Sequence, residues 1–394
     1  MTKALPLIIM DVPEKILTER QAFLALNALP HIGPVSIRRL LDSLGGDPRA
    51  VFAAGVRRLE EVRGIGPAAS SSIANWRAHF DLAREEERMA AGGVSFVTMQ
   101  DDIYPKPLRE LHDRPAGLYR KGRYDFGRPA IAMVGTRRTT LYGQAVAKKF
   151  AAELARLGFC VVSGLARGID TAAHEGALST GGKTVAVLGC GIDIVYPPEN
   201  LELYRRVMET GAVVSEFPFG RRADRQTFAM RNRIIAGMCE AVIVVESDVN
   251  GGSMITARFA GEQGRHVFAV PGRIDQATSR GCHQLIRDGA TLLTSVDDIL
   301  DELSYLEGLR PKPIPPKAGD AAGAAAAGVD AAGLSGPEAA VMACFAGGAM
   351  PTPDAIAAQT GRKAAEISAT LMMLELKRHI AKRADGSFEA RGEG

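Results

Sequence analysis

The most constraining feature of this sequence is a series of short apolar runs separated by stretches long enough for a helix. Such runs occupy residues 131–134, 159–164, 184–189, 212–216, 241–246 and 266–270. Near-continuous apolar strands that alternate with helices form a parallel sheet covered by helices on both faces. We therefore predict an α/β fold built on a Rossmann-like, mostly parallel sheet flanked by helices.

In a sheet of this kind the ligand lies beyond the carboxyl ends of the strands. The first run ends at Gly135, and Thr136 and Arg137 follow it in a short polar turn before an expected helix at 141–157. A helix N-terminus offers free N–H groups and a partial positive charge, so a glycine and an arginine beside it can cradle a phosphate. The alternative is that Gly135 serves only the conformation of the turn.

Polar residues also follow the second and fourth runs. Between residues 217 and 235 five arginines accompany a single acid, Asp224, although the net charge of the whole chain is only +3. This local excess of positive charge is the footprint expected for a polyanion partner, whereas a solvated surface is the plainer reading. The candidate binding residues after these two runs are Ser163, Gly164, Arg167, Gly168, Arg225, Phe228, Arg231, Asn232 and Arg233.

Some of these candidates have a structural alternative. Arg231 and Arg233 stand at an expected helix start and could brace the loop by bonding neighbouring carbonyls or Glu216 instead of binding a phosphate. The ring of Phe228 could stack on a base, or it could pack in the core under the following helix.

Other motifs fail to meet the requirements of catalysis. The segment from Gly176 to Lys183 has one residue too many for a P-loop and precedes a strand, whereas a P-loop follows one. The histidines show no metal-ligand spacing, and His174 is more plausible as a hydrogen-bonding partner in the structure than as a base. We expect no enzyme activity, no catalytic residue, no metal and no cofactor.

The flanking regions predict additional domains. Residues 1–90 read as a helical domain of the helix-hairpin-helix or SAM-like kind, because His31–Pro34 and Gly64–Pro67 repeat one glycine turn between short helices. Such turns bind phosphates through backbone N–H groups, or they only pack against their neighbours. Residues 91–306 form the sheet domain, in which 94–122 predict an edge strand and loops.

The C-terminal part is separated from the sheet domain by an Ala, Gly and Pro linker at 307–335. Residues 336–394 show the order of a winged helix: three helices followed by a hairpin with its turn at Asp385-Gly386. This part carries seven basic and seven acidic residues, so a protein contact is as plausible as duplex binding. What the winged helix binds stays open, as does a DNA contact by the N-terminal hairpins.

The five cysteines are scattered without a Cys-x-x-Cys pair and are expected to be reduced and mostly buried. The N-terminal apolar run is short and is broken by Pro6 and Asp11, and no later segment reaches the length of a membrane span. We expect a cytoplasmic protein without membrane contact.

Eight motifs, taken together in this order and spacing, closely resemble the DNA-processing protein A family, known as DprA or Smf. They are GTRRTTLYG, SGLARGID with Ala173-His174, GKTVAVLGCGID, Tyr196-Pro197, SEFPFG, Phe228 with RNRIIAG, GGSMITA and PGRI. The resemblance covers roughly residues 95–295. It implies Arg137 and Lys183 as phosphate ligands, and Arg225 with Phe228 as the basic and aromatic edge of a DNA pocket.

The resemblance also implies a function. Members of this family bind single-stranded DNA without sequence preference, protect it from nucleases and help load the RecA recombinase during natural transformation, and they act as homodimers. The main alternative is a nucleotide-cleaving phosphoribohydrolase-type enzyme with a related fold. That enzyme needs a glutamate aimed at the ribose from the helix after Gly251-Gly252, and Glu262 stands too far along the chain.

Overall fold

The computed structural model describes residues 17–306, 336–345, 351–377, 379–382 and 386–390. The chain divides into two compact units, Met1–Arg310 and Pro311–Gly394, and each is described by itself. All five cysteines are buried free thiols, as predicted. Within the described residues, no helix combines the length and apolar character needed to cross a membrane.

The first unit is organised around a sheet of nine strands in the order β1-β2-β6-β5-β4-β3-β7-β8-β9. The strands from β6 to β9 run parallel, and β2 pairs antiparallel with both β1 and β6. The predicted mostly parallel α/β fold is therefore confirmed. The strands are β1 (Ser95–Thr98), β2 (Gly117–Gly122), β3 (Ala130–Val134), β4 (Cys160–Ser163), β5 (Thr184–Leu188), β6 (Ala212–Ser215), β7 (Ala241–Val244), β8 (His266–Ala269) and β9 (Thr291–Leu292).

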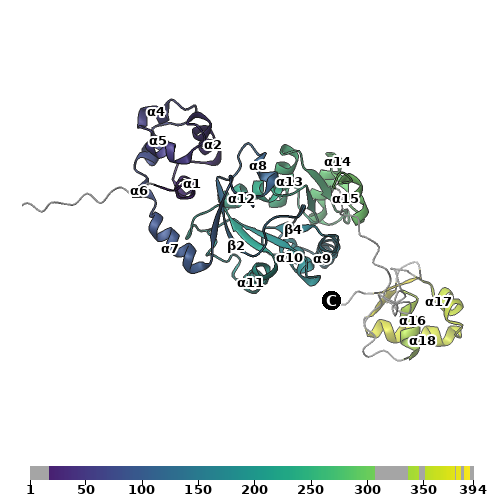
Figure 1. Cartoon of the computed structure of the whole chain (residues 1–394). Coiled ribbons are helices and arrows are strands. Elements are labelled where there is room, and N and C mark those ends of the chain that lie inside the picture. The colour runs from purple at the N-terminus through teal and green to yellow at the C-terminus, as the bar shows by residue number, and fades with distance from the viewer. Residues whose placement is uncertain (1–16, 307–335, 346–350, 378, 383–385, 391–394) are drawn as a thin grey trace, which may run out of the picture. The chain divides into compact units, whose positions relative to one another are not determined.

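Helices cover both faces of this sheet because successive side chains of each strand point to opposite sides. In β3, Ile131 and Met133 belong to one apolar core, while Ala132 and Val134 belong to the other. Figure 1 shows α9 and α10 along one face and α12 and α13 along the other. The helices of this part are α8 (Lys106–Arg109), α9 (Leu141–Arg156), α10 (Ile169–Ser179), α11 (Leu201–Thr210), α12 (Arg225–Gly237), α13 (Gly252–Glu262), α14 (Arg280–Arg287) and α15 (Val296–Glu302), with short 3-10 turns at Pro198–Asn200 and Ala277–Ser279.

Residues 94–122 differ from the prediction because they supply two strands instead of one. Phe96 of β1 faces Tyr119 of β2, and their rings meet edge to face with centroids 5.0 Å apart. Gly117 lies directly under the Phe96 ring, where a Cβ atom would come within 2.3 Å of a ring carbon. The second strand escaped prediction because its glycines and basic residues, GLYRKG, lack an apolar run.

The connections of the sheet reverse direction at β3. From β3 the chain adds β4, β5 and β6 on one side, then returns to place β7, β8 and β9 on the other. The loops that leave β3 and β7 therefore diverge to opposite faces at the carboxyl edge. This topological switch point is where open α/β sheets bind their ligands.

The N-terminal helices repeat one structural unit, as the two phrases in the sequence predict. Gly33 precedes α2 and Gly66 precedes α5, and each helix begins with a proline. His31 and Gly64, at matching positions of the two turns, both have positive φ values of 62° and 86°. These helices are α1 (Glu19–Ala28), α2 (Pro34–Ser43), α3 (Pro48–Ala53), α4 (Val56–Glu60), α5 (Pro67–Ala74), α6 (Trp76–His79) and α7 (Leu82–Gly92).

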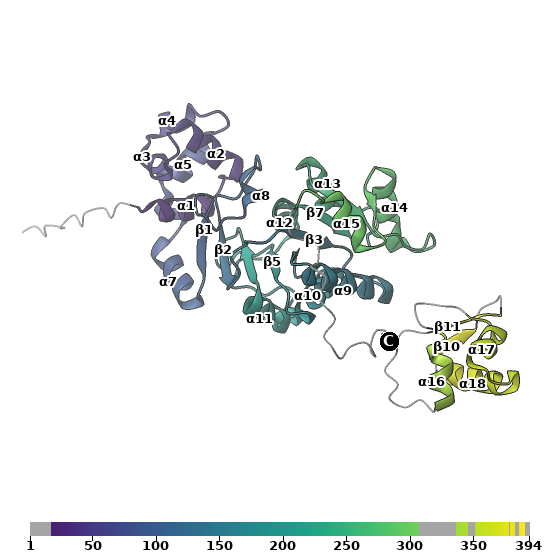
Figure 2. The same ribbon diagram turned by 45° about the vertical axis from the view of Figure 1, so that its right-hand side comes forward.

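The second unit has the predicted winged-helix order. Three helices, α16 (Gly336–Ala343), α17 (Pro353–Thr360) and α18 (Ala364–Leu376), enclose an apolar core. Beside them, β10 (Ile380–Lys382) and β11 (Phe388–Ala390) pair antiparallel (Figure 2). Of the predicted hairpin turn, Gly386 has the positive φ of 84° expected there, and Asp385 lies outside the described residues.

Candidate nucleic-acid interface

A cleft of about 800 Å³ opens at the carboxyl edge of the sheet, at the switch point between β3 and β7. Its walls come from the loops after β3, β4, β5 and β7 and from one side of α12. The lining includes Gly135, Thr136, Arg137, Arg138, Asp170, Tyr196, Arg225, Phe228, Arg231, Asn232 and the turn from Asn250 to Ser253.

The turn after β3 is fixed by close packing at Gly135. A Cβ atom there would lie 2.5 Å from Ile169 and 2.8 Å from the carbonyl oxygen of Glu246, so only glycine fits. The next residue, Thr136, donates its backbone N–H to the same Glu246 carbonyl at 2.7 Å. These contacts fix the backbone of the turn so that Arg137 lies at the opening of the cleft.

The carboxylate of Glu246 then anchors the start of α9. It is buried, and it accepts hydrogen bonds from the Thr139 hydroxyl at 2.7 Å and from the Thr140 N–H at 2.9 Å. Thr140 in turn caps the helix by accepting from the Gly143 N–H at 3.1 Å. Because Glu246 follows β7, this carboxylate ties together the two strands between which the cleft opens.

Three arginines of the cleft are available to an external anion. Arg137, Arg138 and Arg225 are exposed, and none of them forms an ion pair with any residue that the structure describes. The neighbouring Asp224 is engaged elsewhere, because it caps α12 through the Thr227 N–H at 2.8 Å and pairs with Arg221 at 2.7 Å. The rim of the cleft therefore carries uncompensated positive charge.

Phe228 forms an aromatic wall of the cleft. Its ring lies 5.6 Å from that of Tyr196, and the Arg137 guanidinium stands 4.8 Å above it. The side chain is half-buried, it lies over Gly189, and it belongs to none of the apolar cores. The position is suited to a stacked base, and stacking at Phe228 stays a prediction.

Arg231 and Arg233 form internal hydrogen bonds and ion pairs that hold neighbouring loops, and we call such a residue a brace. This is the structural alternative to phosphate binding stated from the sequence for both arginines. Arg231 forms the floor of the cleft, is 4% exposed and donates to the carbonyls of Gly164, at 2.8 Å, and of Val187. Burial lowers the pKa of its guanidinium, opposed by the nearby Asp170 carboxylate. Arg233 does not line the cleft: it is buried on another side of α12 and pairs with both carboxylate oxygens of Glu216.

The residues predicted after β4 shape the loop and do not line the cleft. Ser163 donates to the Met133 carbonyl at 2.7 Å, and Gly164 leaves room for Arg231, whose Nη1 would lie 2.1 Å from a Cβ atom. Gly168 has a φ of 79° and packs on the Thr136 carbonyl. Arg167 is exposed and paired with Glu199.

Two other residues after β4 do line the cleft: Ala166 in the loop and Asp170, the second residue of α10. The Asp170 carboxylate accepts from the N–H groups of Gly164, at 3.1 Å, and of Ala166, at 3.3 Å. Burial raises its pKa, opposed by Arg231. We interpret Asp170 as the group that holds the loop and balances the buried guanidinium on the floor.

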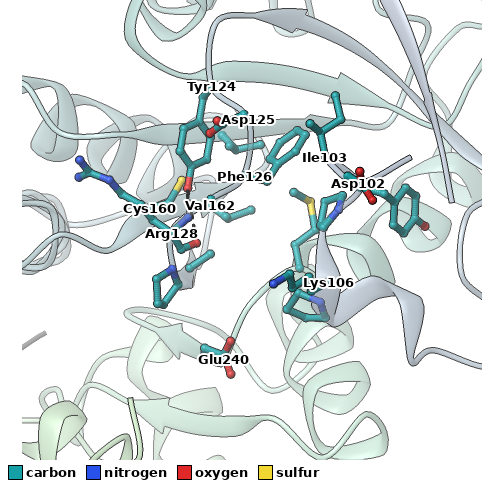
Figure 3. A pocket seen from close by; sticks show the side chains of 18 residues that line it. Asp102, Ile103, Lys106, Tyr124, Asp125, Phe126, Arg128, Cys160, Val162 and Glu240 are labelled. Carbon is teal, nitrogen blue, oxygen red and sulfur yellow. Dashed lines mark hydrogen bonds between the residues drawn. The ribbon is translucent and has the colours of Figure 1, made fainter. Parts of the chain in front are cut away.

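Lys183 was wrongly assigned to this site. It immediately precedes β5 and lies at the amino edge of the sheet, across the full length of the strands from the cleft. A second pocket, of about 310 Å³, opens at that edge among residues such as Tyr124, Cys160 and Glu240 (Figure 3). A residue that stands directly before a strand lies at the amino edge of the sheet and cannot reach the carboxyl edge. The same position before β5 also excludes Lys183 from a P-loop, which follows a strand.

Two parts of the cleft wall are not among the candidate residues chosen from the sequence. Tyr196 follows β5 and faces Phe228, and the turn from Asn250 to Ser253 opens α13 beside the cleft. Gly251 takes the cap position of α13, and the Ser253 hydroxyl donates to Ser247 at 2.8 Å. The glycine pair before the helix was the available signal, because it lets backbone approach a ligand.

Glu262 and His174 lie away from the cleft. Glu262 ends α13, and its exposed carboxylate lies 3.5 Å from Arg258, so it is not directed at a ribose in the cleft. His174 is fully buried, and its Nδ1 donates to the Thr184 hydroxyl at 2.7 Å because that hydroxyl itself donates to the Val161 carbonyl. The interpretation of His174 as a hydrogen-bonding partner is confirmed.

The fold and cleft define a class of protein: a mostly parallel α/β domain with a basic cleft at its switch point and an attached winged helix. The family model described as DNA recombination-mediator protein A matches residues 95–304, and the DprA winged helix domain matches residues 325–386. The chain belongs to this DprA/Smf family of DNA-processing proteins, which confirms the resemblance stated from the motifs.

Individual relatives agree with this assignment. Protein Smf of Synechocystis sp. is 35% identical over 294 residues, covering 73% of this chain and 74% of the relative. DNA processing protein DprA of Streptococcus pneumoniae is 45% identical over 206 residues, covering 52% of this chain and 73% of the relative. The X-ray structure of the Streptococcus pneumoniae DprA superposes with a TM-score of 0.65 at 34% identity, covering 73% of this chain and 98% of that chain.

Proposed function

We propose that this protein binds single-stranded DNA without sequence preference in the cleft at the carboxyl edge. The observation that carries the proposal is the combination of three exposed arginines, which form no ion pair with the residues that the structure describes, and an aromatic wall made by Phe228. Cations neutralise phosphates, and an aromatic ring stacks on any base, so together they bind a strand regardless of its sequence.

The form of the cleft favours a single strand over a duplex. Its aromatic wall is half-buried between the loops after β3 and β5, so only an unpaired base can reach the ring. Gly252 at the start of α13 has open space where a Cβ atom would stand, so a phosphate can approach the backbone there.

We further propose that the bound strand is protected and delivered to the RecA recombinase during recombination or natural transformation, and that the sheet units form a homodimer. Family membership supports both proposals. A dimer through the region of α14 would let one strand engage two clefts, which raises affinity by effective concentration.

The test is a comparison of affinities for the full chain. Fluorescence anisotropy with a labelled oligo-dT strand, a mixed-sequence strand and the matching duplex should show similar binding of the two single strands and clearly weaker binding of the duplex. Duplex affinity equal to or above that of the strands would refute the proposed specificity.

A further inference from the structure

The winged-helix unit exposes its large apolar side chains on one helix. Among the residues that the structure describes in this unit, the large hydrophobics with substantial exposure are Met372 at 67%, Met373 at 48% and Leu376 at 72%. All three belong to α18, whose opposite side buries Ile367, Leu371 and Leu374 in the core.

The exposed side of α18 is a continuous stripe, which we call the α18 stripe: Ala365, Ala369, Met372 and Leu376. Residues three or four apart lie on one face of a helix, so these four side chains form a single row. The row carries no charge. An uncharged helix face on a unit with equal numbers of acids and bases is unsuited to a polyanion, so the stripe is suited to a protein surface.

The stripe is complementary to itself. The spacing of its members is four, three and four residues, which reads the same in both directions. When two copies lie antiparallel, Ala365 of one faces Leu376 of the other, and Ala369 faces Met372. Each contact then places a small side chain opposite a large one, which lets two helices approach closely and interdigitate.

The charges beside the stripe favour the same pairing. Glu366 near the start of α18 and Lys377 just after its end lie on one flank of the stripe, as their helical positions dictate. An antiparallel arrangement brings Glu366 of one copy toward Lys377 of the other, twice per pair. Lys377 already holds Glu338 at 2.7 Å, and its ammonium has further donors for a second carboxylate.

We propose that the winged-helix unit self-associates by antiparallel pairing of two α18 helices through the α18 stripe, and that its partner is a second copy of this chain. The contact is isologous, as a two-fold pair requires. It is much smaller than a standard interface of about 800 Å² per partner, so we expect association in the micromolar range. Any pairing of the sheet units would be a separate step.

The test uses the full chain without DNA in sedimentation experiments across the micromolar range. Ala365→Glu and Leu376→Lys should each weaken the concentration-dependent association by about tenfold or more, because each introduces an unpaired charge into an apolar contact. The double variant should regain association, because the introduced carboxylate faces the introduced ammonium. The two positions are eleven apart on one helix, about three turns, so this ion pair can form only between copies.

Ala358→Glu provides the matched control, because it makes the same substitution at an exposed alanine of α17 and should sediment like the wild type. Thermal unfolding of each variant checks whether the winged-helix unit remains folded. If the single variants sediment like the wild type, the stripe meets some other protein and the proposal is overturned. A double variant that associates no better than the singles also overturns it.

Discussion

The two edges of the main sheet are both hollowed, and they differ in the balance of basic and acidic side chains that line them. At the carboxyl edge the cleft is lined by four arginines and three aspartates, and two of those aspartates are committed to the loop and to the cap of α12. At the amino edge the smaller pocket is lined by two basic and three acidic residues, namely Lys106, Arg128, Asp102, Asp125 and Glu240. Of the two hollows, the one at the carboxyl edge has more basic than acidic lining residues, so a pocket alone does not mark the binding site.

The carboxyl edge also shows that neighbouring arginines have different duties. Arg225 and Arg231 stand six positions apart on α12, yet the first is exposed and has no ion pair within the described part of the chain, and the second is buried under the cleft. A guanidinium that bonds carbonyls inside the protein fixes loop geometry, whereas one at the rim remains free for a phosphate. Variants of a buried and of an exposed arginine, or of one cation from each edge, should therefore behave differently.

The largest effect is expected for a brace. Arg233→Met leaves the Glu216 carboxylate buried at 7% exposure without its partner, which should lower the free energy of unfolding by about 3–5 kcal/mol. The exposed Arg225→Met is the matched control and should unfold within about 0.5 kcal/mol of the wild type. Urea denaturation measures both, and equal midpoints for the two variants would show that Arg233 is not a brace.

A second prediction concerns the pH dependence that His174 imposes. Burial lowers the pKa of its imidazole to about 3, with the Arg231 charge adding to the effect. The pKa of a histidine in the unfolded chain is about 6.5, so below that pH the unfolded state binds a proton that the folded state does not. The free energy of unfolding is therefore at its full value above pH 6.5 and decreases as the pH falls from 6.5 toward 3.

His174→Asn should lack this component, since the asparagine amide can still donate to Thr184 but does not titrate. The difference in unfolding free energy between wild type and variant should therefore change by up to about 1.4 kcal/mol per pH unit in this window. Urea titrations at several pH values provide the measurement. A constant difference from pH 7 to pH 4 would contradict a neutral, buried His174.

Most of the sheet could be predicted because its strands are apolar runs with glycine or polar residues at their ends. The rim of the cleft could also be predicted, since Arg137 lies in the turn after β3, Arg225 begins the helix that follows β6, and the carboxyl ends of parallel strands share one edge. β2 could not, because its glycines and basic residues lack the expected pattern.

Which arginine braces and which is free could not be read from the sequence. That distinction depends on contacts distant along the chain: Arg231 bonds Gly164 and Val187, and Arg233 pairs with Glu216. Lys183 differs for another reason: the family resemblance names it as a phosphate ligand, but it stands before β5 and therefore at the amino edge of the sheet.

The third prediction separates stacking from charge at the carboxyl edge. Phe228→Leu removes the aromatic face beside Tyr196 and should weaken single-strand binding by about 1–3 kcal/mol while leaving its salt dependence unchanged. Anisotropy titrations at several salt concentrations give both quantities, and a thermal melt gives stability. If the variant melts earlier but binds normally while folded, Phe228 is a packing residue.

The most direct test of the account compares one cation from each edge. Arg137→Ala and Lys183→Ala each remove a single positive charge, the first from the cleft and the second from the amino edge. For an oligo-dT strand, the slope of log affinity against log salt should become shallower by roughly 0.7 in Arg137→Ala, the value for one lost phosphate contact, and stay unchanged in Lys183→Ala. An unchanged slope in Arg137→Ala, or a shallower slope in Lys183→Ala, would contradict binding at the carboxyl edge.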